Sequence, residues 1–217
     1  MENQSLVIFA IDYAAKAHSK QRRKNTDKSP YINHPIEVAS MLSQAGVTSA
    51  NIICAALLHD VVEDCANITL EEIRTQFGPI ISTIVGLCSD DKSLPKVNRK
   101  KIQLQHAKEY RIKSRIMYTP NGDKVDVHKC ALLVKLCDKY SNIRNLIEDP
   151  PASWTREEII GYIVWAHKCT TVMSGINARL DAELQNVFDR LFTHYEVKPS
   201  DLPELLEDYY ALVSAQK

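Results

Sequence analysis

The stretch NIICAALLHDVVED, residues 51–64, joins one of the most apolar runs of the chain to a histidine and three acids. The apolar part predicts a core helix rather than a surface helix. Residues three or four positions apart share a helix face, so Asp60, Glu63 and Asp64 converge, with His59 at their edge. Polar side chains at the end of a buried helix are costly unless they have partners. The stretch therefore predicts a core helix that ends in a polar site.

The composition is that of an ordinary globular protein. The 217 residues, 45% hydrophobic and 25% charged, suit one domain that spans residues 1–217. Lys and Arg number 27 and balance 27 Asp and Glu, so no overall field favours nucleic acid or a membrane surface as a partner. The 6 cysteines form no C-x-x-C pair, which is typical of reduced thiols inside a cell. Neither a signal peptide nor a bilayer-spanning run is recognisable, and we expect a cytoplasmic protein.

Helical periodicity dominates the rest of the chain. The predicted helices cover about 6–17, 36–46, 49–64, 70–77, 80–91, 96–111, 129–149 and 155–192. Pro35 is expected to open the second of these helices, and Thr69 with Glu72 predicts a capping box at the fourth. Gly175 lies inside the last pattern, which is either one long helix or two. The pattern predicts one mostly α-helical domain.

One segment departs from this pattern. RIMYTPNGDKVDV, residues 115–127, has two short alternating runs around Pro-Asn-Gly, which predicts a β-hairpin. We expect it to be an insertion on the surface of the domain. The predicted fold class is therefore all-α, a compact multi-helix bundle with a small β-hairpin.

Residues of the kind that bind metals also stand on two other predicted elements. Asp138 and Asn142, four positions apart, follow the apolar run 130–137, and His34 precedes Pro35 at a helix start. Three separate elements thus carry such residues next to sequence that faces the core.

Two histidines and two aspartates would suit a divalent metal such as Mn²⁺, Fe²⁺ or Zn²⁺, with positions left open for water. These residues are His34, His59, Asp60 and Asp138. Each also has an ordinary structural explanation: His34 as a loop or capping residue, and Asp138 as the ion-pair partner of Lys135. Spacing alone supports a metal site and the ordinary explanations about equally.

Three motifs in order resemble a known family. PYINHP (30–35), AALLHDVVED (55–64) and LVKLCDKYSNIRNL (133–146) resemble the HD-domain hydrolases of the SpoT/Rel type, which hydrolyse the alarmone ppGpp. The short length resembles the single-domain animal form. The similarity covers about residues 9–191, while the hairpin and a C-terminal extension at about 194–217 lie outside it.

The resemblance implies an HD-domain helical bundle and specific roles. The implied ligands of one metal ion, usually Mn²⁺ with Zn²⁺ or Fe²⁺ as alternatives, are His34, His59, Asp60 and Asp138. Glu63 and Asp64 form the implied catalytic pair, which orients water and transfers protons. Water activated by the metal would attack the phosphorus joined to the ribose 3′-oxygen, and pyrophosphate would leave from GDP.

A nucleotide substrate also needs cations and a place for its base and ribose. The candidate substrate-binding residues are Arg23, Lys24, Asn142, Tyr162, Lys92 and Lys96. Tyr162 is equally explained as a core residue, and the lysines as solvated surface. The polar loop that carries Arg23 and Lys24 has no evident route to the metal, so we expect both to act through attraction alone.

The sequence also departs from the usual motifs. Val61 replaces the usual threonine after HD, and LCDKYSNIRNL (136–146) replaces the commoner LADKLYNLRDL, with Cys137 as one of its changes. Two alternatives therefore stay open. One is another nucleotide phosphohydrolase, including the NADPH 2′-phosphatase activity associated with the animal branch. The other is a nucleotide-binding regulatory module with weakened catalysis.

Overall fold

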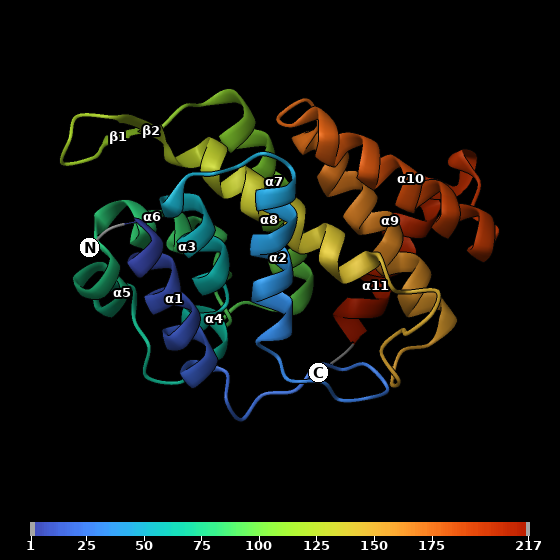
Figure 1. Cartoon of the computed structure of the whole chain (residues 1–217). Helices are drawn as coiled ribbons and strands as arrows, with labels where there is room; N and C mark the ends of the chain where they lie inside the picture. The colour runs from blue at the N-terminus through green and yellow to red at the C-terminus, as the bar shows by residue number, and fades with distance from the viewer. Residues whose placement is uncertain (1–2, 216–217) are drawn as a thin grey trace.

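The computed structural model describes residues 3–215 as a bundle of helices with one short hairpin at its edge (Figure 1). The first half of the chain forms α1 (Asn3–Ala17), α2 (Asn33–Gln44), α3 (Ala50–Leu58), α4 (Val61–Asp64), α5 (Leu70–Phe77) and α6 (Pro79–Cys88). The second half forms α7 (Lys96–Ile112), β1 (Ile116–Tyr118), β2 (Lys124–Asp126), α8 (Val127–Ile143), α9 (Arg156–Met173), α10 (Ala178–Tyr195), the 3₁₀ turn η1 (Pro199–Asp201) and α11 (Leu202–Ala215). The predicted all-α class with a small hairpin is confirmed.

Helix α3 is enclosed by α1, α2, α6 and α8, as its apolar sequence predicts. Its buried residues are Ile52, Cys54, Ala55, Ala56, Leu57 and Leu58. Each fully buried leucine contributes about 1.5–3 kcal/mol through removal of apolar surface from water. Because this helix is covered on several sides, its last residues are held deep in the protein.

The expected single helix over residues 49–64 is wrong. Helix α3 ends at Leu58 and α4 begins at Val61, with His59 and Asp60 forming a turn between them. The His59 side chain donates from Nδ1 to the carbonyl oxygen of Ala56 at 2.7 Å. In a continuous helix, that carbonyl would accept the backbone N–H of residue 60. A side chain that competes for a backbone acceptor favours such an interruption.

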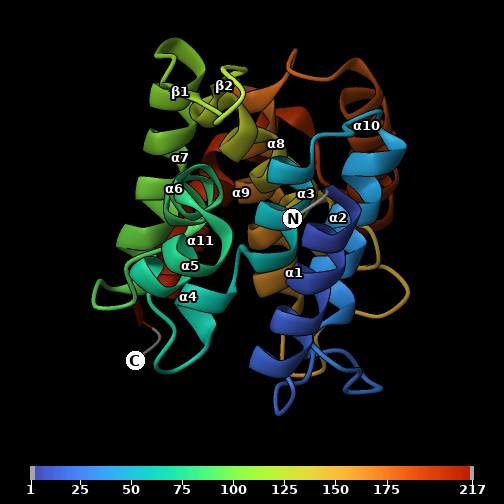
Figure 2. The same cartoon turned by 60° about the vertical axis from the view of Figure 1, so that its left-hand side comes forward.

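Helix α8 links the two halves of the molecule, since it packs against α2, α3 and α6 on one side and α9 and α10 on the other (Figures 1 and 2). It begins earlier than expected, because the Asp126 carboxylate caps it by accepting from the backbone N–H groups of His128 and Lys129. Asp126 also ends β2, so the hairpin leads directly into the helix. The hairpin itself turns through Gly122, whose φ of 86° suits glycine.

Several helix ends differ from the expectation. Helix α2 begins at Asn33, so Pro35 lies within its first turn and His34 is helical. Thr69 caps α5 by accepting from the N–H of Glu72, but the Glu72 carboxylate accepts from the Tyr13 hydroxyl across the α1–α5 contact. The capping box expected there is therefore incomplete, because a tertiary hydrogen bond holds the glutamate.

The predicted helix over residues 155–192 is divided into α9 and α10 at Gly175, whose φ is 81°. A complete capping box, formed by Thr155 and Glu158, begins α9. The C-terminal extension folds as η1 and α11, and α11 packs against α9 and α7. Within residues 3–215, no helix combines the length and the apolarity needed to cross a membrane.

The close approach of α11 to α9 depends on Gly161. A Cβ atom at Gly161 would lie 2.4 Å from Cδ2 of Tyr209, and 2.8 Å from its Cβ. Tyr209 is buried, so it has little room to withdraw. The glycine is therefore required by the packing of the C-terminal extension and not by its backbone conformation.

We expect Gly161→Ala to lower stability. Overpacking costs about 1–3 kcal/mol, which exceeds the gain of up to about 1 kcal/mol from helix propensity. Thermal and urea unfolding of the full chain measure the change. Gly86→Ala is the matched control, because the added Cβ would meet only the end of the Leu70 side chain, at 3.1 Å. Equal stability of the two variants would contradict this account of α11.

Candidate metal centre and adjoining pocket

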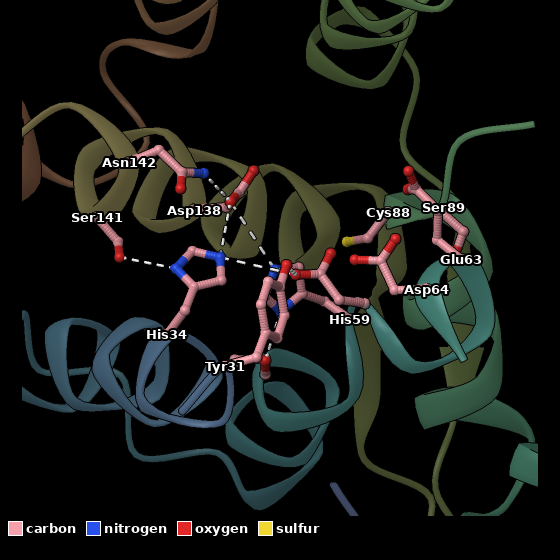
Figure 3. A network of polar contacts seen from close by, with 12 residues as sticks. Tyr31, His34, His59, Glu63, Asp64, Cys88, Ser89, Asp138, Ser141 and Asn142 are labelled. Carbon is pink, nitrogen blue, oxygen red and sulfur yellow. Dashed lines mark hydrogen bonds and ion pairs between the residues drawn. The ribbon is translucent and has the colours of Figure 1, made fainter. Parts of the chain in front are cut away.

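Three helices bring potential metal ligands to one point. His34 of α2, His59 at the end of α3 and Asp138 of α8 each offer one ligand atom, and these atoms lie within 4.8 Å of one another (Figure 3). Oδ1 of Asp138 lies 3.2 Å from Nε2 of His34 and 3.8 Å from Nε2 of His59. Both histidines are buried. His34 also lies within α2, so it is not the loop residue that its position before Pro35 allowed.

Asp60 lies at the edge of this cluster. Its Oδ2 atom is 3.1 Å from Nε2 of His59 and 3.7 Å from Nε2 of His34, and it accepts from the Tyr31 hydroxyl at 2.7 Å. The structure therefore brings together the four residues that the sequence proposed as ligands. Sequence reasoning gave Tyr31 no role, although it stands in the quoted PYINHP motif; its position three residues before His34 was the available signal.

The electrostatics of the cluster favour positive charge. Burial by itself would lower the pKa of His59, but Asp60 and Asp138 raise that pKa well above its ordinary value. Burial would raise the pKa of Asp138, but Lys139 and the two histidines hold it well below its usual range. Lys139 donates to Oδ2 of Asp138 at 2.7 Å, so Asp138 is not paired with Lys135 as the ordinary alternative proposed. Lys135 instead donates to the carbonyl oxygen of Cys88.

The donor set fits a divalent metal. Nε2 of His59 is buried and makes no well-aligned hydrogen bond within residues 3–215, although oxygens of Asp60 and Asp138 lie 3.1 and 3.8 Å away. Nδ1 of the same ring donates to Ala56. In the neutral form of this ring, the proton on Nδ1 leaves the Nε2 lone pair directed toward the cluster. Because the pKa of His59 is raised, a metal that binds there would displace a proton from Nε2. A buried polar atom without a partner is costly unless something binds it. Two imidazole nitrogens with carboxylate oxygens suit a borderline divalent ion.

Glu63 and Asp64 flank the cluster from α4 and line the same small cavity of about 170 Å³. The Glu63 carboxylate accepts from the backbone N–H of Asp90 at 2.9 Å, and burial raises its pKa to about 7. This hydrogen bond exists because α6 ends at Cys88, which frees the N–H groups beyond it. Asp64 accepts from Lys92, one of the six proposed substrate-binding residues. The two residues of the proposed catalytic pair therefore have different partners. Glu63 accepts from a backbone N–H group, and Asp64 accepts from a lysine side chain.

A larger cavity of about 550 Å³ adjoins the cluster. Four residues, Tyr31, His34, Asp64 and Asn142, line both cavities. The larger one also contains Arg23, Lys24 and Tyr162, three of the proposed substrate-binding residues, together with Trp154. The rings of Trp154 and Tyr162 lie 5.2 Å apart and form an aromatic wall. The sequence explained Tyr162 equally well as a core residue and as a substrate-binding residue. In the structure it is buried and also lines the cavity, so the two explanations are compatible.

The two remaining lysines lie outside the lining of the larger cavity. Lys92 is held by Asp64 at the border of the small cavity. The pKa of Lys96 is lowered first by burial and then by the positive charge of Lys24, which places these two cations near each other.

The expectation that the basic loop has no route to the metal cluster is wrong for Arg23. Nη2 of Arg23 donates to Oδ1 of Asn142 at 3.2 Å, and Nδ2 of Asn142 donates to Oδ1 of Asp138 at 2.7 Å. A chain of two hydrogen bonds therefore connects the loop to a proposed ligand. Arg23 and Asn142 are 119 positions apart, so no local pattern could indicate this contact.

Comparison with known proteins identifies the class to which this architecture belongs. The HD domain family model matches residues 10–167, and the chain belongs to the HD domain family. Over most of its length it also resembles a group of proteins named MESH1. The HD domain implies a divalent metal, in agreement with the possible site at His34, His59 and Asp138.

The relatives in question are named guanosine-3′,5′-bis(diphosphate) 3′-pyrophosphohydrolase MESH1. The protein from Xenopus tropicalis is 38% identical over 185 residues, which cover 85% of this chain and 93% of the relative. The human protein is 38% identical over 183 residues, covering 84% and 92%. A solved structure described as a metazoan ortholog of SpoT that hydrolyses ppGpp and plays a role in starvation responses matches with a TM-score of 0.75. It shows 36% identity and covers 86% of this chain and 95% of that one. The resemblance to the SpoT/Rel-type animal form is confirmed.

We expect His59→Ala and Asp138→Ala each to abolish binding of a divalent metal, since each removes an atom of the buried cluster. Asp64→Asn should bind metal as the wild type does, because Asp64 lies outside the cluster and bonds Lys92. Metal content after purification without chelator, measured by mass spectrometry, checks both statements. Loss of metal from Asp64→Asn would show that the division of roles between ligands and catalytic pair is wrong.

Proposed function

We propose that this protein is a metal-dependent nucleotide phosphohydrolase that converts ppGpp to GDP and pyrophosphate. The observation that carries the proposal is the junction between the ligand cluster and the larger, cation-lined cavity, which share Tyr31, His34, Asp64 and Asn142. The MESH1 relatives, which carry this activity in their names, support the choice of substrate. The six free cysteines support a reducing, cytoplasmic location.

We propose one Mn²⁺ ion held by His34, His59, Asp60 and Asp138, with Zn²⁺ or Fe²⁺ as the ions that such donors also accept. When bound, such a metal acts as a Lewis acid that promotes ionisation of water and polarises a phosphoryl oxygen. Burial strengthens these electrostatic effects, because the cluster lies in a region of low dielectric.

Glu63 is the proposed general base. A carboxyl group with a pKa of about 7 is close to neutral pH, where a group can both accept and return a proton efficiently. The bond to the Asp90 N–H fixes one of its oxygens toward the loop after α6. Asp64, which lines both cavities, is the residue that we propose to orient the attacking water.

The proposed reaction is a hydrolysis at phosphorus. Water attacks the phosphorus joined to the ribose 3′-oxygen, the bond from that phosphorus to the ribose oxygen breaks, and pyrophosphate leaves. The ribose oxygen takes up a proton and becomes the 3′-hydroxyl of GDP. Arg23 and Lys24 supply positive charge for the phosphates, with Lys92 and Lys96 nearby, and Asn142 can donate to phosphate or ribose. Trp154 and Tyr162 provide an apolar wall for the base.

Parallel turnover assays with ppGpp, NADPH and dGTP test the proposal. We expect ppGpp to be the best substrate, with GDP and pyrophosphate as products in equal amounts. EDTA should abolish this activity and Mn²⁺ should restore it. Full activity in EDTA would exclude a metal enzyme. Turnover of NADPH without turnover of ppGpp would identify the 2′-phosphatase, and binding of ppGpp without turnover would identify a regulatory module.

The raised pKa of Glu63 predicts a pH dependence. Glu63 must be ionised to accept a proton, so kcat/KM for ppGpp should rise as pH increases through about 7 and then level off. Glu63→Gln should lower kcat by about 10²- to 10⁴-fold and remove this rise. Glu109→Gln is the control, because Glu109 is paired with Lys113 on the far part of α7. A rise that persists unchanged in Glu63→Gln would assign the titration to another group.

A further inference from the structure

Helices α2 and α8 exchange a continuous series of polar contacts that begins at the metal cluster. Asp138 and Ser141 are three apart on α8, and Arg144 follows at the same spacing directly after the helix ends, so all three lie on the side that meets His34 and Glu37 of α2. The series runs Asp138, His34, Ser141, Glu37, Arg144, alternating between the helices. We name these five residues the α2–α8 polar ladder.

Each step of the ladder is a close contact. Oδ1 of Asp138 lies 3.2 Å from Nε2 of His34, and Nδ1 of His34 lies 2.9 Å from the Ser141 hydroxyl oxygen. The Ser141 hydroxyl donates to Oε2 of Glu37, and Oε1 of the same carboxylate pairs with Arg144 at 3.1 Å. Figure 3 shows His34 between Ser141 and Asp138, with one ring nitrogen directed to each.

The direction of these hydrogen bonds determines which tautomer the neutral His34 ring adopts. A carboxylate only accepts, so Glu37 takes the single hydroxyl proton of Ser141. The Ser141 oxygen can then only accept from the ring, which requires a proton on Nδ1 of His34. In the neutral ring, Nδ1 therefore carries the only proton, and the Nε2 lone pair faces the cluster, as a metal ligand requires.

Burial makes this arrangement specific. His34 and Ser141 are 2% and 3% exposed, so in the folded protein Ser141, and not bulk water, is the partner of Nδ1. The Glu37 and Arg144 side chains are part-exposed and form the outer end of the ladder. Partners of a metal-bound histidine typically change metal affinity by about 10- to 100-fold when they are removed.

We propose that Ser141 and Glu37 are positioning residues that orient His34 for metal binding. This inference rests on the proposed metal site and adds to it a tautomer-selecting chain that reaches the protein surface. Both residues also line the larger cavity, so direct contact with nucleotide is the competing role. The experiment must therefore separate metal affinity from substrate affinity.

The test measures Mn²⁺ affinity by competition with a chelator, without nucleotide, for the wild type and four variants. Ser141→Ala should weaken Mn²⁺ binding about tenfold or more. Glu37→Ala should weaken it less, and Glu37→Gln should stay near the wild type, because the amide oxygen still accepts the serine proton. Ser40→Ala is the matched control, since Ser40 lies on the same helix and only accepts from Gln44.

Kinetics complete the test. At saturating Mn²⁺, Ser141→Ala should regain its KM for ppGpp, because the nucleotide contacts are intact. Wild-type Mn²⁺ affinity in Ser141→Ala, or a KM that stays raised at saturating Mn²⁺, would overturn the inference and leave the proposed function standing. If Ser141→Ala does not fold, wild-type affinity in Glu37→Ala overturns it equally. Failure of the wild type itself to bind Mn²⁺ would instead overturn the proposed function, and the inference with it.

Discussion

The convergence of two imidazoles and two carboxylates beneath the surface is the constraint on which the rest of the structure depends. Buried ionisable groups are tolerated only when they are paired, hydrogen-bonded or bound to a metal. Here each member has a partner on another helix, and Lys139 and Tyr31 complete the arrangement around the aspartates. The site is therefore also a set of cross-links between α2, α3 and α8. Removing one member would leave its partners buried and unpaired, which costs more than the lost contact itself.

Helix α8 connects this site to the remainder of the molecule. Asp138 and Ser141 face α2, whereas Lys139, on another side of the helix, lies 5.1 Å from the ring of Trp165 on α9. Asn142 reaches the basic loop through Arg23. One helix thus positions a proposed ligand, its orienting serine and the contact to the proposed phosphate-binding loop. A small displacement of α8 would therefore move residues of the metal cluster and of the pocket together.

The C-terminal extension supports the far wall of the pocket. Tyr209 of α11 packs over Gly161, the residue directly before Tyr162. Tyr162 in turn contacts Trp154 and Trp165, and Lys100 lies over the Tyr162 and Trp165 rings. Buried aromatic clusters of this kind are stiff, since their packing leaves few alternative rotamers. The extension, which lies outside the motifs of the family, is thus placed to stabilise a surface that we propose contacts the nucleotide.

The sequence alone determined the helical class, the hairpin and the identity of the candidate ligands. Those predictions depend on local properties, namely the spacing of apolar residues, turn chemistry at Pro-Asn-Gly, and short motifs with metal-binding side chains. The tertiary structure decided the rest: the turn at His59 and Asp60, the link from Arg23 to Asp138, and the polar ladder through Ser141 and Glu37. The link from Arg23 joins residues 119 positions apart, and the ladder joins α2 to α8. The turn depends instead on a side-chain bond from His59 to Ala56 that helical periodicity does not reveal. Periodicity within one helix shows which face is buried, but only packing shows which side chain of another helix it meets.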